Sequence, residues 1–240
     1  VKDIPHRFVG VLPFSHEITS NEPLVGTDFI PYGSTLFTTL AMELKWKGLS
    51  FDLNTFNYEA AIANRRDMLN DEYVLSVKDA ISFMKAQSQV SQWFIRPSKD
   101  LKQFSGQVID AWECAEWLAD AVQCASSGTY QLDEQETVVV ATPQKILAEW
   151  RWFIVGGEVI DGAMYRAHGQ LVKKHETDPM VIYEAQEFAN GWLPDANCVM
   201  DLALTVRGVK VIEFNCINSS GSYGHDLTKI FRSLYEYHCR

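Results

Sequence analysis

The stretch VIEFNCINSSG, residues 211–221, places two polar side chains inside an apolar run. The residues that open it are β-branched or aromatic, a composition typical of a strand. Glu213 and Asn215 interrupt the run two positions apart. Because residues two apart in a strand point to the same face, the sequence aims a carboxylate and an amide at one place.

The preceding apolar run, CVMDLALTV at 198–206, is predicted to form a hairpin with this strand. A three-residue loop at 206–208 fits, because such loops often end in a residue with positive φ, and Gly208 stands there. This loop sets Asp201 opposite Glu213 and leaves the other face apolar. Carboxylate and amide oxygens on a rigid sheet suit Mg²⁺, which takes substrate phosphates as further ligands. The alternative is a strand near a solvent edge with ordinary polar residues.

A second predicted hairpin gathers charge around Gly156 and Gly157, a pair typical of a two-residue primed turn. In this register Glu149, Arg151 and Arg166 lie on one side of the ribbon. Arginine binds phosphate through two parallel hydrogen bonds, so two arginines at the end of an apolar ribbon suit a polyphosphate. The alternative is a structural pair of arginine and glutamate within the sheet.

A third basic segment is FIRPSKDLKQFSG at 94–106. A strand ends near Arg96, and a polar loop with Lys99 and Lys102 follows before the next apolar segment. A loop between strands with cations at its base can fold over phosphates as a lid. The spacing is not that of a Walker P-loop, and the alternative is a solvated turn.

Composition narrows the class of protein. The chain has 240 residues, of which 47% are hydrophobic, enough for one core or two modest ones. The net charge of −10 argues against a general binder of nucleic acid or anionic membranes. The five cysteines are odd in number and lack paired metal spacing, so we expect a reduced, cytoplasmic protein. No apolar run reaches about 18 residues and no signal peptide is visible, so no membrane span is expected.

Strands and helices are mixed along the sequence, which predicts an α+β or α/β fold. We expect helices capped at Ser34 or Thr35 and at Ser76. The predicted helices cover 34–48, 57–69, 76–87, 110–125, 177–191 and 225–237. The predicted strands cover 7–14, 28–33, 92–97 and 137–142 and the hairpins 148–166 and 198–215. A polar stretch at 88–91 is a candidate domain boundary.

Three segments together resemble the ATP-grasp superfamily. The comparison is with ATP-grasp ligases that add glutamate to ribosomal protein. Their central ribbon resembles EWRWFIVGGEVIDGAMYR, and their D…E-x-N magnesium hairpin resembles MDLAL together with VKVIEFNCINSSG. WFIRPSKDLKQFSG is similar to the R-two-K clade, frequent in phages and bacteria, in which an arginine and a lysine replace the usual lysine and glycine-rich loop. IPYGSTLFTTLAMELKWKG also resembles that clade, so the likeness spans 28–226.

The resemblance implies an ATP-grasp fold in which two α+β subdomains sandwich ATP. A small α/β N-terminal domain would occupy 1–90 and the ATP-grasp domain 91–240, with a lid subdomain at 91–142 and a metal- and phosphate-binding subdomain at 143–240. The lid would be short or differently built, because the glycine-rich loop is almost absent.

The resemblance also implies roles for single residues. The ligands of one or two Mg²⁺ ions would be Asp201, Glu213 and Asn215. Nucleotide would be bound by Arg96, Lys99 and Lys102 at its phosphates, by the backbone of Val140 and Ala141 at adenine, and by Glu149 near the metal. The catalytic residues would be Arg151 and Arg166, at the transferred phosphoryl group, and a substrate carboxylate would be cradled by Ser219, Ser220 and Gly221.

The implied function is an ATP- and Mg²⁺-dependent carboxylate–amine ligase that acts through an acyl phosphate. Its partners would be ATP, a small carboxylate or a peptide or protein substrate, and an amine acceptor. Two alternatives stay open, a phosphotransferase that phosphorylates a small molecule and a nucleotide-binding interaction protein without turnover. His168, His175 and His225 could be general bases, although surface or capping roles are the more common use of such residues.

Overall fold

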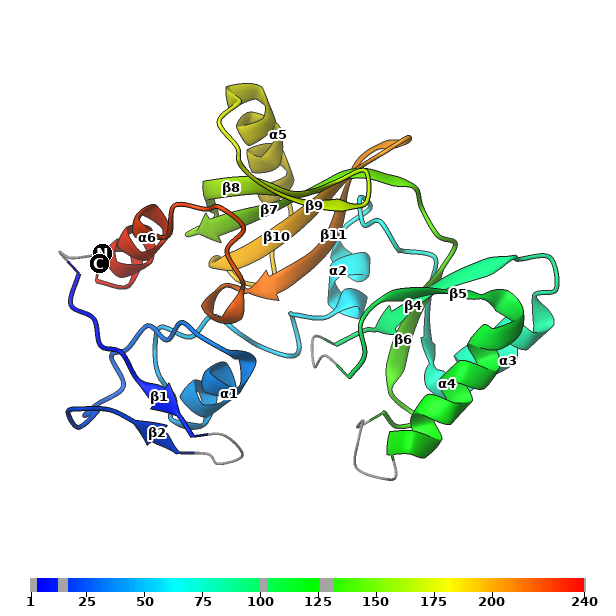
Figure 1. Cartoon of the computed structure of the whole chain (residues 1–240), viewed down its shortest axis with the longest axis horizontal. Coiled ribbons are helices and arrows are strands. Elements are labelled where there is room, and N and C mark those ends of the chain that lie inside the picture. The colour runs from blue at the N-terminus through cyan, green and yellow to red at the C-terminus, as the bar shows by residue number, and fades with distance from the viewer. Residues whose placement is uncertain (1–3, 13–16, 100–102, 126–131, 240) are drawn as a thin grey trace. The chain divides into compact units, whose positions relative to one another are not determined.

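The structure is a computed structural model (Figure 1). Its helices and sheets confirm the predicted mixed class. Within the part of the chain that the structure describes, no helix is long and apolar enough to cross a membrane. The described residues are 4–12, 17–99, 103–125 and 132–239.

The described residues fall into two compact units. The first contains the chain up to Phe51, then Glu149–Asp201 and the chain from Phe214 onward. The second contains Asp52–Ala148 and Leu202–Glu213. The division of 1–90 from 91–240 that the sequence suggests stays a prediction.

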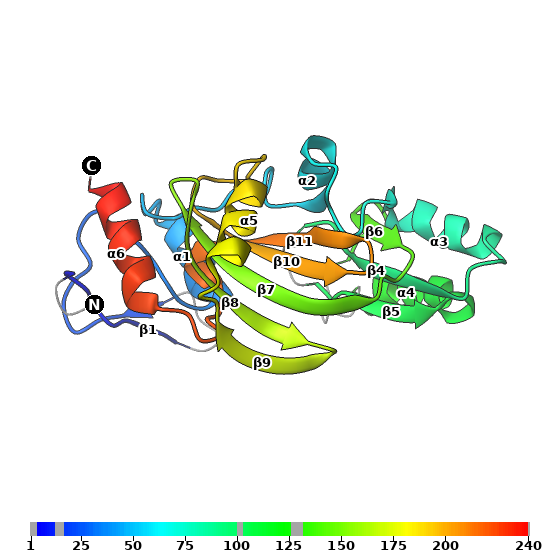
Figure 2. The ribbon, with the colours of Figure 1, turned by 90° about the horizontal axis from the view of Figure 1, so that it is seen from above.

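The largest sheet has five strands in the order β11-β10-β7-β8-β9. Figure 2 shows them side by side, with α5 (Pro179–Ala189) over one face. The strands are β7 (Ile146–Val155), β8 (Glu158–Ala167), β9 (Gln170–His175), β10 (Cys198–Thr205) and β11 (Gly208–Cys216).

Tight turns join neighbouring strands of this sheet. Gly156 and Gly157, between β7 and β8, have φ of 63° and 83°, as a primed turn requires. Gly208 has φ of 100° at the start of β11. The positive φ predicted at each turn is confirmed and explains why glycine stands there. The loop between β10 and β11 is 206–207 rather than the predicted 206–208, because Gly208 belongs to β11.

Two helices complete the first unit around the sheet. Both α5 and α6 (Leu227–His238) contact β8. The Asp226 carboxylate caps α6 by accepting from the backbone N–H groups of Thr228 and Lys229. Ile230 and Leu234 of α6 form an apolar core with Phe153, Val155, Val199 and Ile217.

The N-terminal part of the first unit contains β1 (Gly10–Val11), β2 (Ile18–Thr19) and α1 (Thr35–Glu43). The Ser34 hydroxyl accepts from Phe37 N, which confirms Ser34 as the cap of α1. The strand expected at 7–14 is strand only at β1 within its described residues, and no strand forms at 28–33.

The prediction at 28–33 is wrong because this extended segment has no partner strand. Its carbonyl groups instead accept single hydrogen bonds, that of Phe29 from Gly48 N and that of Pro31 from the Asn218 amide. A Cβ atom at Gly48 would lie 2.7 Å from the Cα of Ile30, so only glycine allows this close approach.

The second unit contains a four-stranded sheet in the order β3-β6-β4-β5. Its strands are β3 (Tyr73–Ser76), β4 (Gln92–Pro97), β5 (Gln107–Asp110) and β6 (Thr137–Ala141). Its helices are α2 (Tyr58–Asn64), α3 (Val77–Ala86) and α4 (Ala111–Ala125), and the latter two pack against each other. The core joins the two helices to one sheet face through Val77, Ala80, Met84, Trp93, Ile95, Cys114, Ala115, Leu118, Leu132, Val138 and Val140.

Local chemistry explains the elements that the sequence predicted in this unit. The Ser76 hydroxyl accepts from Asp79 N at 3.0 Å and caps α3 as expected. Trp93 and Ile95 enter the core, so Arg96 leaves β4 on the other face. The strands β3 and β9 were not predicted. β3 has four residues directly before a helix cap, and β9 is a mostly exposed edge strand with no apolar signal.

Candidate functional site

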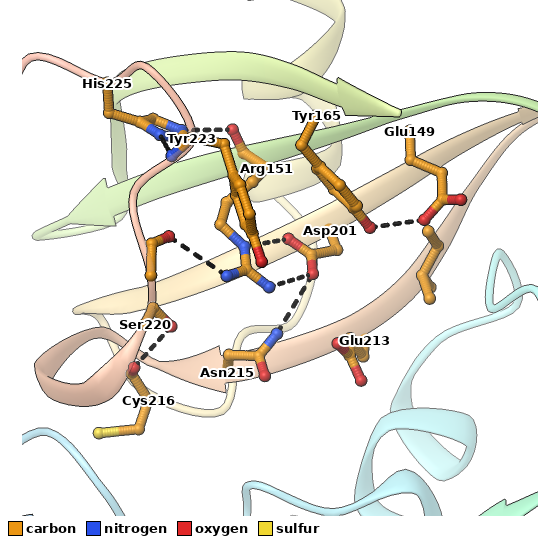
Figure 3. A network of polar contacts seen from close by, with 12 residues as sticks. Glu149, Arg151, Tyr165, Asp201, Glu213, Asn215, Cys216, Ser220, Tyr223 and His225 are labelled. Carbon is orange, nitrogen blue, oxygen red and sulfur yellow. Dashed lines mark hydrogen bonds and ion pairs between the residues drawn. The ribbon is translucent and has the colours of Figure 1, made fainter. Parts of the chain in front are cut away.

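A buried ion pair joins β7 and β10 in the first unit (Figure 3). Arg151 donates from Nε to Asp201 Oδ1 over 2.9 Å and from Nη2 to Oδ2 over 2.7 Å. The Asp201 side chain is 1% exposed and that of Arg151 11%. Asn215 of β11 donates its amide to the same carboxylate over 3.4 Å. A carboxylate buried this deeply needs a cation beside it, and Arg151 supplies one.

The Arg151 guanidinium also contacts the loop after β11 and Tyr165 of β8. Arg151 Nη1 donates to the carbonyl oxygen of Gly221 over 3.3 Å. The guanidinium carbon lies 5.1 Å from the ring centroid of Tyr223 and 5.7 Å from that of Tyr165. The two rings stack on each other with centroids 5.1 Å apart. A carboxylate, a carbonyl and two aromatic faces therefore fix the direction of this guanidinium.

Glu149 forms a second polar contact on β7. Tyr165 OH donates to its Oε2 over 2.6 Å, and Arg166 Nη1 lies 3.4 Å from its Oε1. The pairing of β8 with β9 shifts register between Met164 and Arg166. At this irregularity the consecutive residues Tyr165 and Arg166 both reach Glu149. In a regular strand their side chains would point to opposite faces. Glu149 is 9% exposed and Arg166 47%, so Arg166 is the solvent-facing partner.

Ser220 is committed to the shape of its own loop. Its hydroxyl donates to the carbonyl oxygen of Cys216 over 2.8 Å. Its carbonyl accepts from Tyr32 OH over 2.6 Å, and burial raises the pKa of that phenol. Ser219 ends a short 3₁₀ turn, Ile217–Ser219. The role of Ser219, Ser220 and Gly221 toward a substrate carboxylate stays a prediction.

Asn218 ties this loop to the N-terminal part of the first unit. Its side chain is fully buried and accepts from Ser50 N over 2.9 Å. Its amide donates to the carbonyls of Pro31 and Gly48 over 2.7 and 2.9 Å. Its backbone carbonyl accepts from Gly33 N. The end of the β11 segment is thereby fixed by residues far away in the sequence.

Arg96 has its own cluster in the second unit. Its Nη1 lies 2.5 Å from Glu213 Oε2 and donates to Tyr58 OH over 3.1 Å. Its guanidinium carbon is 4.3 Å from the centroid of the Tyr58 ring. Tyr58 OH donates in turn to the carbonyl of Ile212. Burial raises the pKa of Tyr58 to about 12, with Arg96 opposing and Glu213 reinforcing the shift, so this phenol stays protonated.

The other predicted nucleotide ligands are also in the second unit. Lys99 is exposed and its backbone pairs with that of Asn57. Lys102 lies outside the described residues. Val140 pairs with strands on both sides, with Tyr73 of β3 and Ile95 of β4, whereas Ala141, the last residue of β6, pairs with Phe94 of β4. The backbone N–H that follows, that of Thr142, donates to the Glu72 carboxylate over 3.0 Å. The adenine contact of Val140 and Ala141 stays a prediction.

The predicted metal ligands fit Mg²⁺ by their chemistry. Asp201, Glu213 and Asn215 offer hard oxygen donors, and Glu213 and Asn215 are alternate residues of one strand. Each carboxylate is bound by an arginine, which shows that a positive charge is held at both positions. Nowhere in the described part of the chain do three or more His, Cys, Asp or Glu side chains gather as a metal site. The remaining ligands would have to be phosphate and water.

Three residues of these clusters were not foreseen from the sequence. Tyr58, Tyr165 and Tyr223 each contact a predicted arginine or glutamate. The available signal was weak. Tyr223 lies in the polar loop SSGSYGHD next to a predicted site, but Tyr58 opens an ordinary helix 38 residues before Arg96.

Solved structures of other proteins share this fold. The chain is similar to the D-alanine-D-alanine ligase from Coxiella burnetii, with a TM-score of 0.60 and 12% identity over 97% of this chain and 74% of that one. It is similar to the D-alanyl-alanine synthetase A from Vibrio cholerae, with a TM-score of 0.55 and 14% identity over 98% of this chain and 84% of that one. For a RimK domain protein ATP-grasp from Sphaerobacter thermophilus, the TM-score is 0.55 and the identity is 12% over 88% of this chain and 80% of that one.

Together with the family match given next, these likenesses establish the ATP-grasp fold that the sequence predicted. No curated protein matches the chain. The model of one protein family, described as ATP-grasp domain, R2K clade family 3, matches residues 58–234. Because this match covers most of the 240 residues, the chain belongs to family 3 of the R2K clade of ATP-grasp domains.

Proposed function

We propose that this protein is an ATP- and Mg²⁺-dependent ligase that joins a carboxylate to an amine through an acyl phosphate. The observation that carries the proposal is the Arg151 cluster, in which a guanidinium on a rigid strand is oriented by Asp201, Gly221 and two tyrosine rings. Two of the similar structures are named as a ligase and a synthetase of D-alanine units, which supports ligation as the class of reaction.

The proposed chemistry needs electrostatic stabilisation more than a side-chain nucleophile. An oxygen of the substrate carboxylate attacks the γ-phosphorus of ATP, and ADP leaves. The nitrogen of the amine then attacks the acyl carbon, phosphate leaves, and the amine loses a proton as the amide forms. Arg151 and Arg166 would stabilise the charge on the transferred phosphoryl group. Arg151 is already oriented, which reduces the reorganisation that the transition state requires.

The other residues would bind the reactants. Mg²⁺, when bound by Asp201, Glu213 and Asn215, would supply charge neutralisation at the phosphates. The remaining phosphate contacts would come from Arg96, Lys99 and Lys102, the adenine contacts from the backbone near Val140 and Ala141, and the carboxylate contacts from Ser219, Ser220 and Gly221. The partners would be ATP, a small carboxylate or a peptide or protein, and an amine, with the cytoplasm as the setting.

A two-stage experiment tests this function. ATP with Mg²⁺ should raise the melting temperature, because a ligand that binds only the folded state stabilises it. Amino acids and dipeptides are then screened for release of ADP that depends on an added amine. Amine-dependent ADP and an amide product support the ligase. A stable phosphorylated product without amine would favour the phosphotransferase, and binding without turnover the interaction protein. No thermal shift with any purine nucleotide would refute the proposal.

A further inference from the structure

His225 bridges β7 and the loop that carries Gly221 and Tyr223 (Figure 3). Tyr223 N donates to its Nδ1 over 3.0 Å, and its Nε2 lies 3.0 Å from the carbonyl oxygen of Arg151. A backbone N–H can only donate and a carbonyl can only accept, so Nδ1 is the acceptor and Nε2 carries the hydrogen. Both ring nitrogens are thus used by backbone, which leaves neither for a reacting group.

This bridge holds the loop at a point where the loop holds Arg151. Gly221 accepts from the guanidinium, and the Tyr223 ring lies beside it. His225 links the strand to the loop, because one ring nitrogen bonds the backbone of Arg151 and the other bonds the backbone of Tyr223. Release of the imidazole would free the loop from β7 and remove the carbonyl and the aromatic face from the guanidinium.

We propose that His225 is a positioning residue whose neutral imidazole fastens the loop of Gly221 and Tyr223 to β7 and thereby orients the Arg151 guanidinium. The expected effect of His225 on ATP affinity rests on the proposed function, in which Arg151 binds phosphate. The bridge itself is a property of the free protein and can be tested without nucleotide.

The bridge requires the uncharged ring. An imidazolium carries hydrogen on both nitrogens, so its Nδ1–H would face the Tyr223 N–H, donor against donor. His225 is 9% exposed and packs edge-on against the Phe153 ring, 4.8 Å between centroids. Burial lowers the pKa of His225; hydrogen bonding to the Arg151 carbonyl opposes that shift.

Charged groups face His225 from each neighbouring strand. Asp161 of β8 raises its pKa, whereas the Arg151 guanidinium of β7 and His175 of β9 lower it. Asp161 is buried, bonds His175 Nε2 over 2.8 Å and accepts from the backbone N–H of Asp226 over 2.9 Å. Asp226, the residue after His225, uses its carboxylate to cap α6. His175 is therefore the neighbouring histidine that a control variant has to remove.

Nuclear magnetic resonance of the free protein tests the bridge. In the wild type, ¹⁵N-histidine spectra should show His225 with hydrogen on Nε2, and the Nε–H signal of Arg151 should be slow to exchange. His225→Phe keeps the packing against Phe153 and removes both hydrogen bonds. In this variant the Arg151 Nε–H should exchange at least about tenfold faster at neutral pH, the change expected from loss of about one hydrogen bond. A merely structural role would lower the melting temperature and leave the Arg151 signal unchanged.

The pH profile separates the two histidines. In the wild type, protection of the Arg151 Nε–H should be lost as pH falls below about 6.5, the ordinary pKa of histidine. That step should be absent in His225→Phe and retained in His175→Asn. A step that persists in His225→Phe and vanishes in His175→Asn would overturn the proposal, as would a His225 ring with hydrogen on Nδ1 or a folded His225→Phe with unchanged Arg151 exchange.

ATP affinity provides the link to function. Where the wild type binds ATP with Mg²⁺, His225→Phe should bind it about tenfold more weakly at neutral pH, because the guanidinium is no longer oriented. Comparing wild type and variant at each pH cancels protonation of ATP itself. Failure of the wild type to bind ATP would refute the proposed function and leave the spectroscopic test of His225 intact. Equal affinity in both would refute the link between His225 and phosphate binding.

Discussion

Replacing Arg151 by Met should destabilise the protein strongly. The change removes a bidentate cation from the Asp201 carboxylate, which is 1% exposed. Removing one partner of a buried ion pair typically costs about 3–5 kcal/mol, because the other charge stays buried without compensation. Loss of the hydrogen bond to Gly221 adds about 1 kcal/mol. We therefore expect Arg151→Met to lower the free energy of unfolding by about 4–6 kcal/mol.

A double-mutant cycle isolates the ion pair. Asp201→Asn keeps the shape of the carboxylate but removes its charge, and should cost about 1.5–3 kcal/mol because a charged hydrogen bond is lost. The double variant contains neither buried charge. It should be more stable than the sum of the two losses predicts, with a coupling energy of about 2 kcal/mol. Urea unfolding followed by tryptophan fluorescence provides the free energies.

Arg166→Met is the matched control for this cycle. Arg166 is 47% exposed and 3.4 Å from Glu149, so its pair contributes only about 0–1 kcal/mol. Two results would refute the reasoning. One is a coupling energy between Arg151 and Asp201 below about 0.5 kcal/mol, which is the error of additivity for independent sites. The other is a loss in Arg166→Met as large as that in Arg151→Met.

Three further predictions concern other groups. Glu213→Gln should reduce ATP affinity modestly and turnover about a hundredfold, measured by calorimetry and ADP release; equal losses in both would make Glu213 a ground-state binding residue. Asn218→Ala removes the buried side-chain hydrogen bonds to the backbone of Ser50, Pro31 and Gly48 and should lower the free energy of unfolding by about 3 kcal/mol; a loss below about 1 kcal/mol would contradict the role of Asn218 in holding these segments together. Stability should fall as pH drops below about 6.5, because the pKa of His225 is lowered in the folded state and the unfolded chain binds the proton first. The slope of that loss should be smaller in His225→Phe, since His238, whose pKa burial also lowers, still titrates; an unchanged slope would contradict the assignment.

The elements predictable from the sequence are those fixed by local rules. Gly156, Gly157 and Gly208 stand where the turns need positive φ. Ser34 and Ser76 cap helices because their hydroxyls reach a backbone N–H three residues later. These features depend on a few neighbouring residues, so pattern and propensity suffice to find them.

Contacts set by tertiary packing could not be predicted in the same way. Arg96 and Glu213 are 117 residues apart in sequence, and Arg151 and Asp201 are 50 apart. Alternation along a strand gives the face of each side chain but does not choose its partner. The consecutive residues Tyr165 and Arg166 both reach Glu149 where the β8 pairing shifts register, a break in the same alternation. His225 was considered as a general base, although its two nitrogens are bound by backbone.

The arginine–carboxylate pairs bear on how phosphate would be recognised. From the sequence, a structural pair with Glu149 was the alternative to phosphate binding by Arg151 and Arg166. In the structure Arg166 lies 3.4 Å from Glu149, whereas Arg151 pairs with Asp201 and Arg96 with Glu213. An arginine can be part of a structural pair and also bind phosphate, because what matters is the difference in free energy between its interaction with the carboxylate and with the phosphate. An arginine that already has a carboxylate partner gains only the difference between that partner and a phosphate, so the pair lowers affinity for phosphate and keeps the guanidinium oriented. Affinity for ATP would then depend on which cation neutralises the carboxylate when phosphate takes the arginine. Mg²⁺ bound to the same carboxylates would do so, which is why we expect the contributions of metal and arginine to be strongly non-additive.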